Sequence, residues 1–212
     1  MELNLFVYVL LIFCIPYLLY SNFRIHPRKG FSILFISIIS SVVVLKFSLF
    51  SLIGIIPLIS SLLIINKKYY KYLYGASFLI LNYQLLMELD LSIFTLILSN
   101  LFPISLISGV FSSMMIGHWF LVDPTISKQG MKKIALFCTF HSLTLIPLVF
   151  FEVIGEDIDN LFKNVILFLY FSTSILSFGS FKSLGEKSYT GVMASTGLSY
   201  LSLIVSLGAS GG

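Results

Sequence analysis

The chain has 212 residues, of which 58% are hydrophobic and only 10% are charged, and its mean hydropathy is +1.02. This composition lies far outside the range of soluble domains and places the chain in a lipid bilayer. The net charge of +4 does not indicate a nucleic-acid surface, because the basic residues stand in short groups between apolar runs. The composition therefore argues against a soluble domain and against a nucleic-acid partner.

Eight apolar runs are candidates for membrane-spanning helices, since a span needs about 20 apolar residues, or fewer where the bilayer thins. In chain order they cover residues 4–20, 31–45, 47–65, 73–88, 97–122, 134–154, 161–181 and 189–208. The N-terminus lacks the features of a cleaved signal peptide, so we expect the first run to remain as a span. The sequence thus predicts an all-α fold: one integral membrane domain, residues 1–212, built as a polytopic transmembrane helix bundle of about eight spans.

The basic residues predict the orientation of this bundle. The odd-numbered loops between the runs carry Arg24, Arg28, Lys29, Lys67, Lys68, Lys71, Lys128, Lys132, Lys133, Lys182 and Lys187. Only Lys46 and Lys163 fall on the opposite side. Because loops rich in Lys and Arg stay in the cytoplasm, we expect these loops inside and both termini outside, N-out and C-out. We expect a multi-pass protein of a prokaryotic plasma membrane.

Two of the runs are ambiguous. Residues 31–65 hold one charge, Lys46, with no Gly or Pro beside it, so this stretch could form one helix instead of two. A single helix would be about 52 Å long and would put the first and third basic loops on opposite sides, so we predict a hairpin. Residues 91–122 are too long for one span, and Asn100 and Pro103 predict a break before the fifth helix.

Small residues recur at steps of three or four on three of the predicted helices. These ridges are Ser105, Gly109, Ser113 and Gly117 on the fifth helix, Thr173, Ser177 and Ser180 on the seventh, and Gly191, Ser195 and Ser199 on the eighth. In lipid, small residues let helices approach closely, so helix–helix contact is the general interpretation. The alternative is a polar groove for a solute, or a slot for a planar cofactor.

His118 and His141 lie within the fifth and sixth runs. Along the helix, His118 lies about 8 Å from Asp123, and His141 lies about 12 Å from Lys133. Asp123 and Lys133 are both expected at the same membrane surface. A short loop joins the two helices, so we expect antiparallel neighbours with both imidazoles at similar depth. Such a pair could hold haem b as axial ligands, bind a quinone or relay a proton. Met114 and Gly117, close to His118 on the helix, complete the predicted cofactor site.

Packing is the competing interpretation of these residues. His118 would then bond across a helix interface, with Trp119 at headgroup depth and Asp123 ending the helix. A metal held by His118, His141 and Cys138 is a further candidate, although a single C-x-x-H lacks the second cysteine pair of a zinc site. The sequence shows no hydrolase, P-loop or zinc-protease motif, so we assign no catalytic residue, and whether the chain is an enzyme stays open.

These observations lead to three functional hypotheses. The first is a membrane subunit or anchor of an electron-transport system that binds haem b or quinone through His118 and His141. The second is a small-solute or ion transporter that uses the Ser/Gly/Thr grooves. The third is a non-catalytic assembly partner of a membrane complex. In each case the expected partners are the lipid bilayer and another membrane protein.

Overall fold

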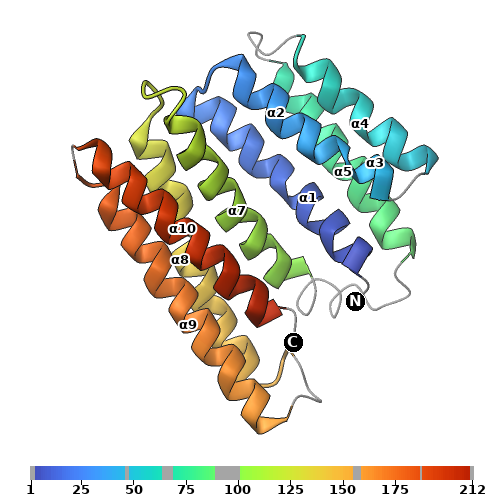
Figure 1. The fold of residues 1–212 in the computed structure, drawn as a ribbon. Helices are drawn as coiled ribbons and strands as arrows, with labels where there is room; N and C mark the ends of the chain where they lie inside the picture. The colour runs from blue at the N-terminus through green and yellow to red at the C-terminus, as the bar shows by residue number, and fades with distance from the viewer. Residues whose placement is uncertain are drawn as a thin grey trace. The chain divides into compact units, whose positions relative to one another are not determined.

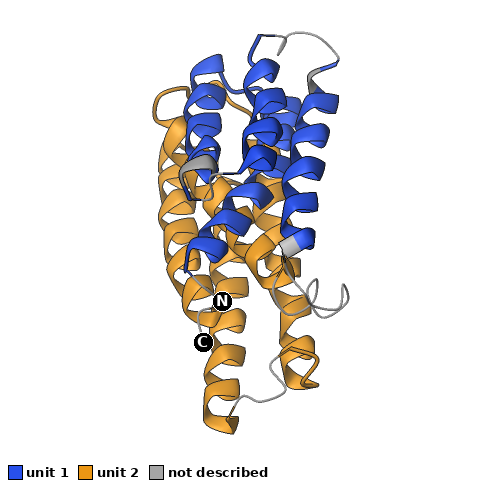
Figure 2. Ribbon diagram, turned by 90° about the vertical axis from the view of Figure 1, so that its right-hand side faces the viewer, with its two compact units in different colours: residues 1–93 blue, residues 94–212 orange. Residues whose placement is uncertain are grey.

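The structure is a computed structural model that describes residues 3–45, 48–63, 69–88, 101–154, 159–186 and 188–210 (Figure 1). These described residues form helices and turns and contain no strand, which confirms the all-α prediction for this part of the chain. The chain divides into two compact units, residues 1–93 and residues 94–212 (Figure 2). The prediction of a single membrane domain stays a prediction.

Unit 1 is built around α1 and α5. Its helices are α1 (Leu3–Tyr20), α2 (Lys29–Ser40), α3 (Val42–Leu45), α4 (Leu49–Ser61) and α5 (Tyr70–Glu88). A π-helical turn, η1 (Ser21–Ile25), extends α1, and the His26 N–H closes it by donating to the Ser21 carbonyl oxygen at 2.9 Å. Both α1 and α4 pack against α5.

The helix break that the sequence predicts near Lys46 is present. Helix α3 ends at Leu45, and Ser48 caps α4 by accepting a hydrogen bond from the Ser51 N–H at 3.0 Å. Such a side-chain cap satisfies one of the backbone donors that a helix start leaves unpaired. Lys46 itself lies outside the described residues. Helix α2 contacts α4, as a hairpin requires, so residues 31–65 do not form one continuous helix.

A buried polar cluster joins three helices of unit 1. The hydroxyls of Tyr8 on α1 and Ser51 on α4 both donate to the side-chain oxygen of Gln84 on α5, each at 3.0 Å. All three side chains are buried. In an apolar interior an unpaired amide or hydroxyl is costly, so these bonds hold α1 and α4 at defined positions along α5.

Unit 2 is a closed four-helix bundle. Its helices are α7 (Phe102–Phe120), α8 (Lys128–Phe150), α9 (Asn160–Ser183) and α10 (Tyr189–Ser210). Each helix packs against the next, and α10 packs back against α7. Pro103 lies in the first turn of α7. Backbone N–H groups in the first turn have no acceptor within the helix, so proline, which lacks this group, loses no helical hydrogen bond there. This agrees with the predicted break, although Asn100 and the segment before it lie outside the described residues.

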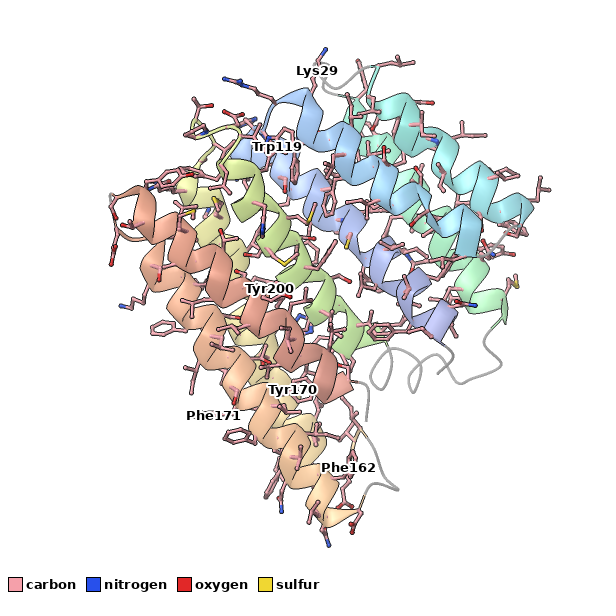
Figure 3. The ribbon with its side chains drawn as sticks, in the orientation of Figure 1. Lys29, Trp119, Phe162, Tyr170, Phe171 and Tyr200 are labelled. Carbon is pink, nitrogen blue, oxygen red and sulfur yellow. The ribbon has the colours of Figure 1, made fainter. Side chains whose placement is uncertain are left out.

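Four described helices are long and apolar enough to cross a membrane: Leu3–Ile25, Lys128–Phe150, Asn160–Ser183 and Tyr189–Ser210. Each of the eight predicted runs contains a helix, but α2 and α4 have only 12 and 13 residues. Large apolar side chains such as Phe162, Phe171 and Tyr200 are exposed on the outer surface of unit 2 (Figure 3). So many exposed large apolar side chains are unusual for a soluble monomer and support a membrane protein.

The basic loops share one end within each unit. In unit 2, the Lys128 ammonium donates to the carbonyl oxygens of Glu186 and Ser188 at 3.3 and 3.1 Å, so the loops before α8 and α10 are neighbours. In unit 1, the Lys71 ammonium lies 4.0 Å from the centre of the Phe23 ring, so the loops before α2 and α5 are neighbours. Of the predicted basic residues of these loops, three lie outside the described residues: Lys67, Lys68 and Lys187.

The far end of unit 2 carries an ion pair that we expect to depend on pH. The Lys163 ammonium lies 2.7 Å from a Glu152 carboxylate oxygen, and this hydrogen bond lowers the pKa of Glu152 from its ordinary value of 4.5. A lowered pKa in the folded state means that the pair stabilises the fold above pH 4.5 and stops doing so as pH falls through the lower folded-state pKa. Thermal unfolding of wild type and Glu152→Gln should therefore differ at neutral pH and converge in acid.

Lys163→Gln is the control, because it removes the same ion pair from the other side. It should show the same loss at neutral pH and the same convergence. A difference from wild type that persists unchanged into acid would contradict the role of this pair. The carboxylate is exposed to solvent, so the effect should be small and should weaken in high salt.

Candidate functional site

His118 lies in the last turn of α7 and is exposed. Its Nδ1 lies 3.1 Å from the carbonyl oxygen of Met114, one turn earlier on the same helix. A carbonyl oxygen can only accept, so Nδ1 donates. The loop after α7 is folded by Asp123, whose buried carboxylate accepts the Thr125 N–H at 3.3 Å. The local structure thus agrees with the interpretation of this segment as a helix end.

His141 lies in the middle of α8 and is only 6% exposed. Its Nε2 lies 3.1 Å from the carbonyl oxygen of Phe102 and 3.4 Å from the Ser105 hydroxyl, both on α7. Its ring packs on the Phe102 ring with centroids 4.3 Å apart. Because the carbonyl oxygen can only accept, the neutral ring carries its proton on Nε2 and its lone pair on Nδ1. Within the described residues, Nδ1 is buried and has no hydrogen-bond partner.

The structure does not bring the two histidines together. His141 bonds to Phe102, which precedes His118 by 16 residues on α7, or about 24 Å along a helix. Helices α7 and α8 are adjacent, as predicted, but the expected equal depth is wrong. The physical reason is that α8 begins at Lys128, so Lys133 belongs to the helix and His141 lies farther from the loop than the charge pattern indicates.

This separation does not fit a haem b held by both histidines, or a metal held by both with Cys138. Cys138 is buried on α8, and within the described residues no three side chains of metal-ligating type come together. The other predicted cofactor residues also contact protein. The backbone carbonyl oxygen of Met114 accepts a hydrogen bond from His118 Nδ1, and Gly117 packs against Thr196 of α10.

The predicted small-residue ridges of α7, α9 and α10 meet inside unit 2. Six buried serines there form what we call the serine cluster: Ser113, Ser177, Ser180, Ser195, Ser199 and Ser202. The Ser180 hydroxyl lies 2.6 Å from that of Ser195 and 3.2 Å from that of Ser199. Helix–helix contact, the general interpretation of the ridges, is therefore what the structure shows.

Further hydroxyl pairs extend the serine cluster to all three helices. The Ser199 hydroxyl also lies 3.3 Å from that of Ser113, and the hydroxyls of Ser177 and Ser202 are 3.0 Å apart. In each of these pairs either oxygen can donate. Four of the hydroxyls thus form one hydrogen-bonded chain, from Ser113 through Ser199 and Ser180 to Ser195, while Ser177 and Ser202 form a separate pair. In both, the bonds can reverse direction without moving the helices.

The serine cluster is tightly closed. Val110, Ala135 and Cys138 complete the lining of the gap between its hydroxyls, and this gap has no room for a water molecule. The predicted polar groove is thus not open in this structure. Ser202 is a member that the sequence analysis missed, although it continues the ridge of α10 three residues after Ser199.

Gly117 offers a direct test of the close approach between α7 and α10. A Cβ added there would collide with the Thr196 Oγ1 and lie 3.1 and 3.2 Å from its Cβ and Cγ2. Rotating Thr196 would break its hydrogen bond to the Val192 carbonyl oxygen and would leave the tight contact with its Cβ in place. We expect Gly117→Ala to destabilise the fold by about 1–3 kcal/mol. Thermal unfolding in detergent would measure this loss.

The matched control is Gly197→Ala on α10, where an added Cβ meets nothing within 4 Å. Since alanine favours a helix over glycine by about 1 kcal/mol, this variant should be as stable as wild type or slightly more stable. Equal stability of the two variants would show that the contact between Gly117 and Thr196 does not restrict the helix spacing.

Together, the fold and this site define an all-helical protein of membrane type with a hydroxyl-rich core in its second unit. Comparison with protein-family models, with curated proteins and with solved structures finds no match for the chain.

Proposed function

We propose that the protein is a multi-pass membrane transporter in which unit 2 carries a small polar solute or ion past the serine cluster. One observation carries this proposal: six buried serines on three helices bond across the bundle, four of them in one chain and two as a separate pair. The three helices are those on which the sequence predicts a Ser/Gly/Thr-lined groove.

The bonding pattern of these serines differs from that of structural serines in the same helix. Ser172 and Ser183 on α9 donate to the carbonyl oxygens of Phe168 and Gly179, one turn earlier. A serine bonded in this way satisfies its hydroxyl within its own helix. The cluster serines instead form hydrogen bonds with each other. A solute with hydrogen-bond donors and acceptors can therefore take the place of one serine as the partner of another, at little cost in free energy.

Transport through the serine cluster requires a conformational change. The cluster has no room for water, so α10 would have to move away from α7 and α9 to admit a solute. Such rocking of one part of a bundle against another is how many transporters alternate access to a buried site. The structure then corresponds to the closed state.

The proposal includes about eight spans, with basic loops in the cytoplasm and both termini outside a prokaryotic plasma membrane. The neighbouring basic loops within each unit support this orientation. The short helices α2 and α4 would span the membrane only if the bilayer thins around them or if their flanking side chains extend to the membrane surface.

Solute flux into liposomes tests the role of the serine cluster. Proteoliposomes containing wild type should admit at least one of glycerol, urea, Na⁺, K⁺ or H⁺ faster than empty liposomes. Ser180→Ala removes two hydroxyl contacts of about 1 kcal/mol each, so we expect the flux of that solute to change by about fivefold or more. Stopped-flow light scattering and ion-sensitive dyes would measure it.

Ser172→Ala is the matched control, because Ser172 lies on the same helix but bonds only to its own backbone. Its flux should equal that of wild type. Wild-type flux equal to that of empty liposomes would contradict transport of these solutes and favour the assembly role, which co-purification of a partner would test. Unchanged flux in a folded Ser180→Ala variant would contradict passage through the serine cluster.

A second candidate function, quinone binding at His141, is favoured by the buried lone pair of Nδ1. The bond of Nε2 to Phe102 holds the tautomer that leaves Nδ1 able to accept a hydrogen bond, for example from a hydroquinone hydroxyl. Among the residues of the predicted redox site, only His141 keeps this capacity inside the bundle, because His118 is exposed.

His141→Ala should therefore lose any quinone that co-purifies with the wild-type protein, as measured by solvent extraction and chromatography. His118→Ala is the control and should retain it. An absence of bound quinone and of haem absorbance in wild type, or equal quinone content in the two variants, would contradict this candidate.

A further inference from the structure

Unit 1 has one strongly basic end. Arg24 and Arg28 follow the end of α1, Lys29 begins α2, and Lys71 lies in the first turn of α5. All four side chains are exposed. We call these four residues the basic end of unit 1.

Two of these cations share a single aromatic ring. The Arg24 guanidinium carbon lies 4.9 Å from the centre of the Phe23 ring, and the Lys71 ammonium lies 4.0 Å from the same centre. A ring face attracts one cation, but two cations that both lie near one ring also repel each other. An anion bound to both Arg24 and Lys71 would offset that repulsion.

The backbone beneath Phe23 is held in place from inside unit 1. Asn22 donates to the Tyr74 hydroxyl at 2.9 Å and accepts the Ser32 hydroxyl at 2.7 Å, so one buried amide joins α1, α2 and α5. The π-helical turn η1 contains Asn22, Phe23 and Arg24 together. With Asn22 bonded inward, Phe23 and Arg24 are presented outward beside Lys71 in a preformed arrangement.

The described side chains of unit 1 supply Arg24 and Lys71 with no carboxylate partner. No carboxylate is among the described side chains of unit 1. In the sequence, the three acidic residues of unit 1 are Glu2, which precedes α1, Glu88, which ends α5, and Asp90, which follows it. Arg24 and Lys71 belong to the opposite ends of these helices. Two lysines of unit 2 differ, because Lys163 is paired with Glu152 and Lys128 with backbone carbonyl oxygens.

We propose that the basic end of unit 1 binds the phosphate of an anionic phospholipid headgroup, with Arg24 and Lys71 as its principal contacts. A guanidinium and an ammonium are the usual protein donors to phosphate. The surroundings favour a lipid over a soluble phosphate, because Tyr69 and Tyr72 are exposed beside Lys71 and aromatic side chains of this kind lie at headgroup depth. This inference is independent of transport and of quinone binding.

Native mass spectrometry of the delipidated full-length protein tests this site. Phosphatidylglycerol should bind in preference to phosphatidylcholine with the same acyl chains. The double variant Arg24→Gln/Lys71→Gln should lower the affinity for phosphatidylglycerol about 30-fold, since each basic side chain at a membrane surface adds about fivefold to anionic-lipid affinity. The single variant Lys71→Gln should lower it about fivefold.

The control variant Lys128→Gln/Lys163→Gln loses the same charge from side chains that already have protein partners, and should bind phosphatidylglycerol like wild type. Equal wild-type affinity for the two lipids would overturn the proposal, as would an unchanged affinity in Lys71→Gln and in the double variant. Displacement of phosphatidylglycerol by millimolar inorganic phosphate would overturn the lipid assignment and indicate a soluble phosphate ligand.

Discussion

Helices surrounded by lipid gain no association energy from burying apolar side chains, because lipid is as apolar as a protein interior. Close backbone approach and hydrogen bonds across helices must therefore hold this fold together. In unit 2 these are the contact of Gly117 with Thr196 and the serine cluster. In unit 1 they are the bonds that Gln84 and Asn22 make to neighbouring helices. Buried hydroxyl and amide groups occur in the interior of both units, and most of them lie in unit 2.

The same constraint explains why helix packing and the proposed transport route share residues in unit 2. A serine in a membrane helix can satisfy its hydroxyl within its own turn, as Ser183 does. Serines that bond across the bundle hold the helices together in the closed state, yet they leave polar groups available once the helices part. The transport proposal depends on this second property of Ser180 and its neighbours.

The two histidines show how helix limits control a predicted site. Sequence spacing placed His118 and His141 at equal depth by taking Lys133 as the membrane surface. In the structure α8 starts at Lys128, and because α7 and α8 pack side by side, His141 lies beside Phe102 instead of His118. The bond to Phe102 gives His141 a different property, a fixed tautomer with a buried lone pair.

The sequence by itself determined the helical class, the position of a helix in each apolar run, the break near Lys46 and the small-residue ridges. These features follow from local properties, namely hydrophobic run length, proline and small-residue spacing, and each is present in the described residues. Only the tertiary structure decided which ridges meet, that Arg24 and Lys71 share the Phe23 ring, and that His118 and His141 are apart. The reason is that helix rotation and relative depth depend on contacts between helices, which spacing along one chain does not specify.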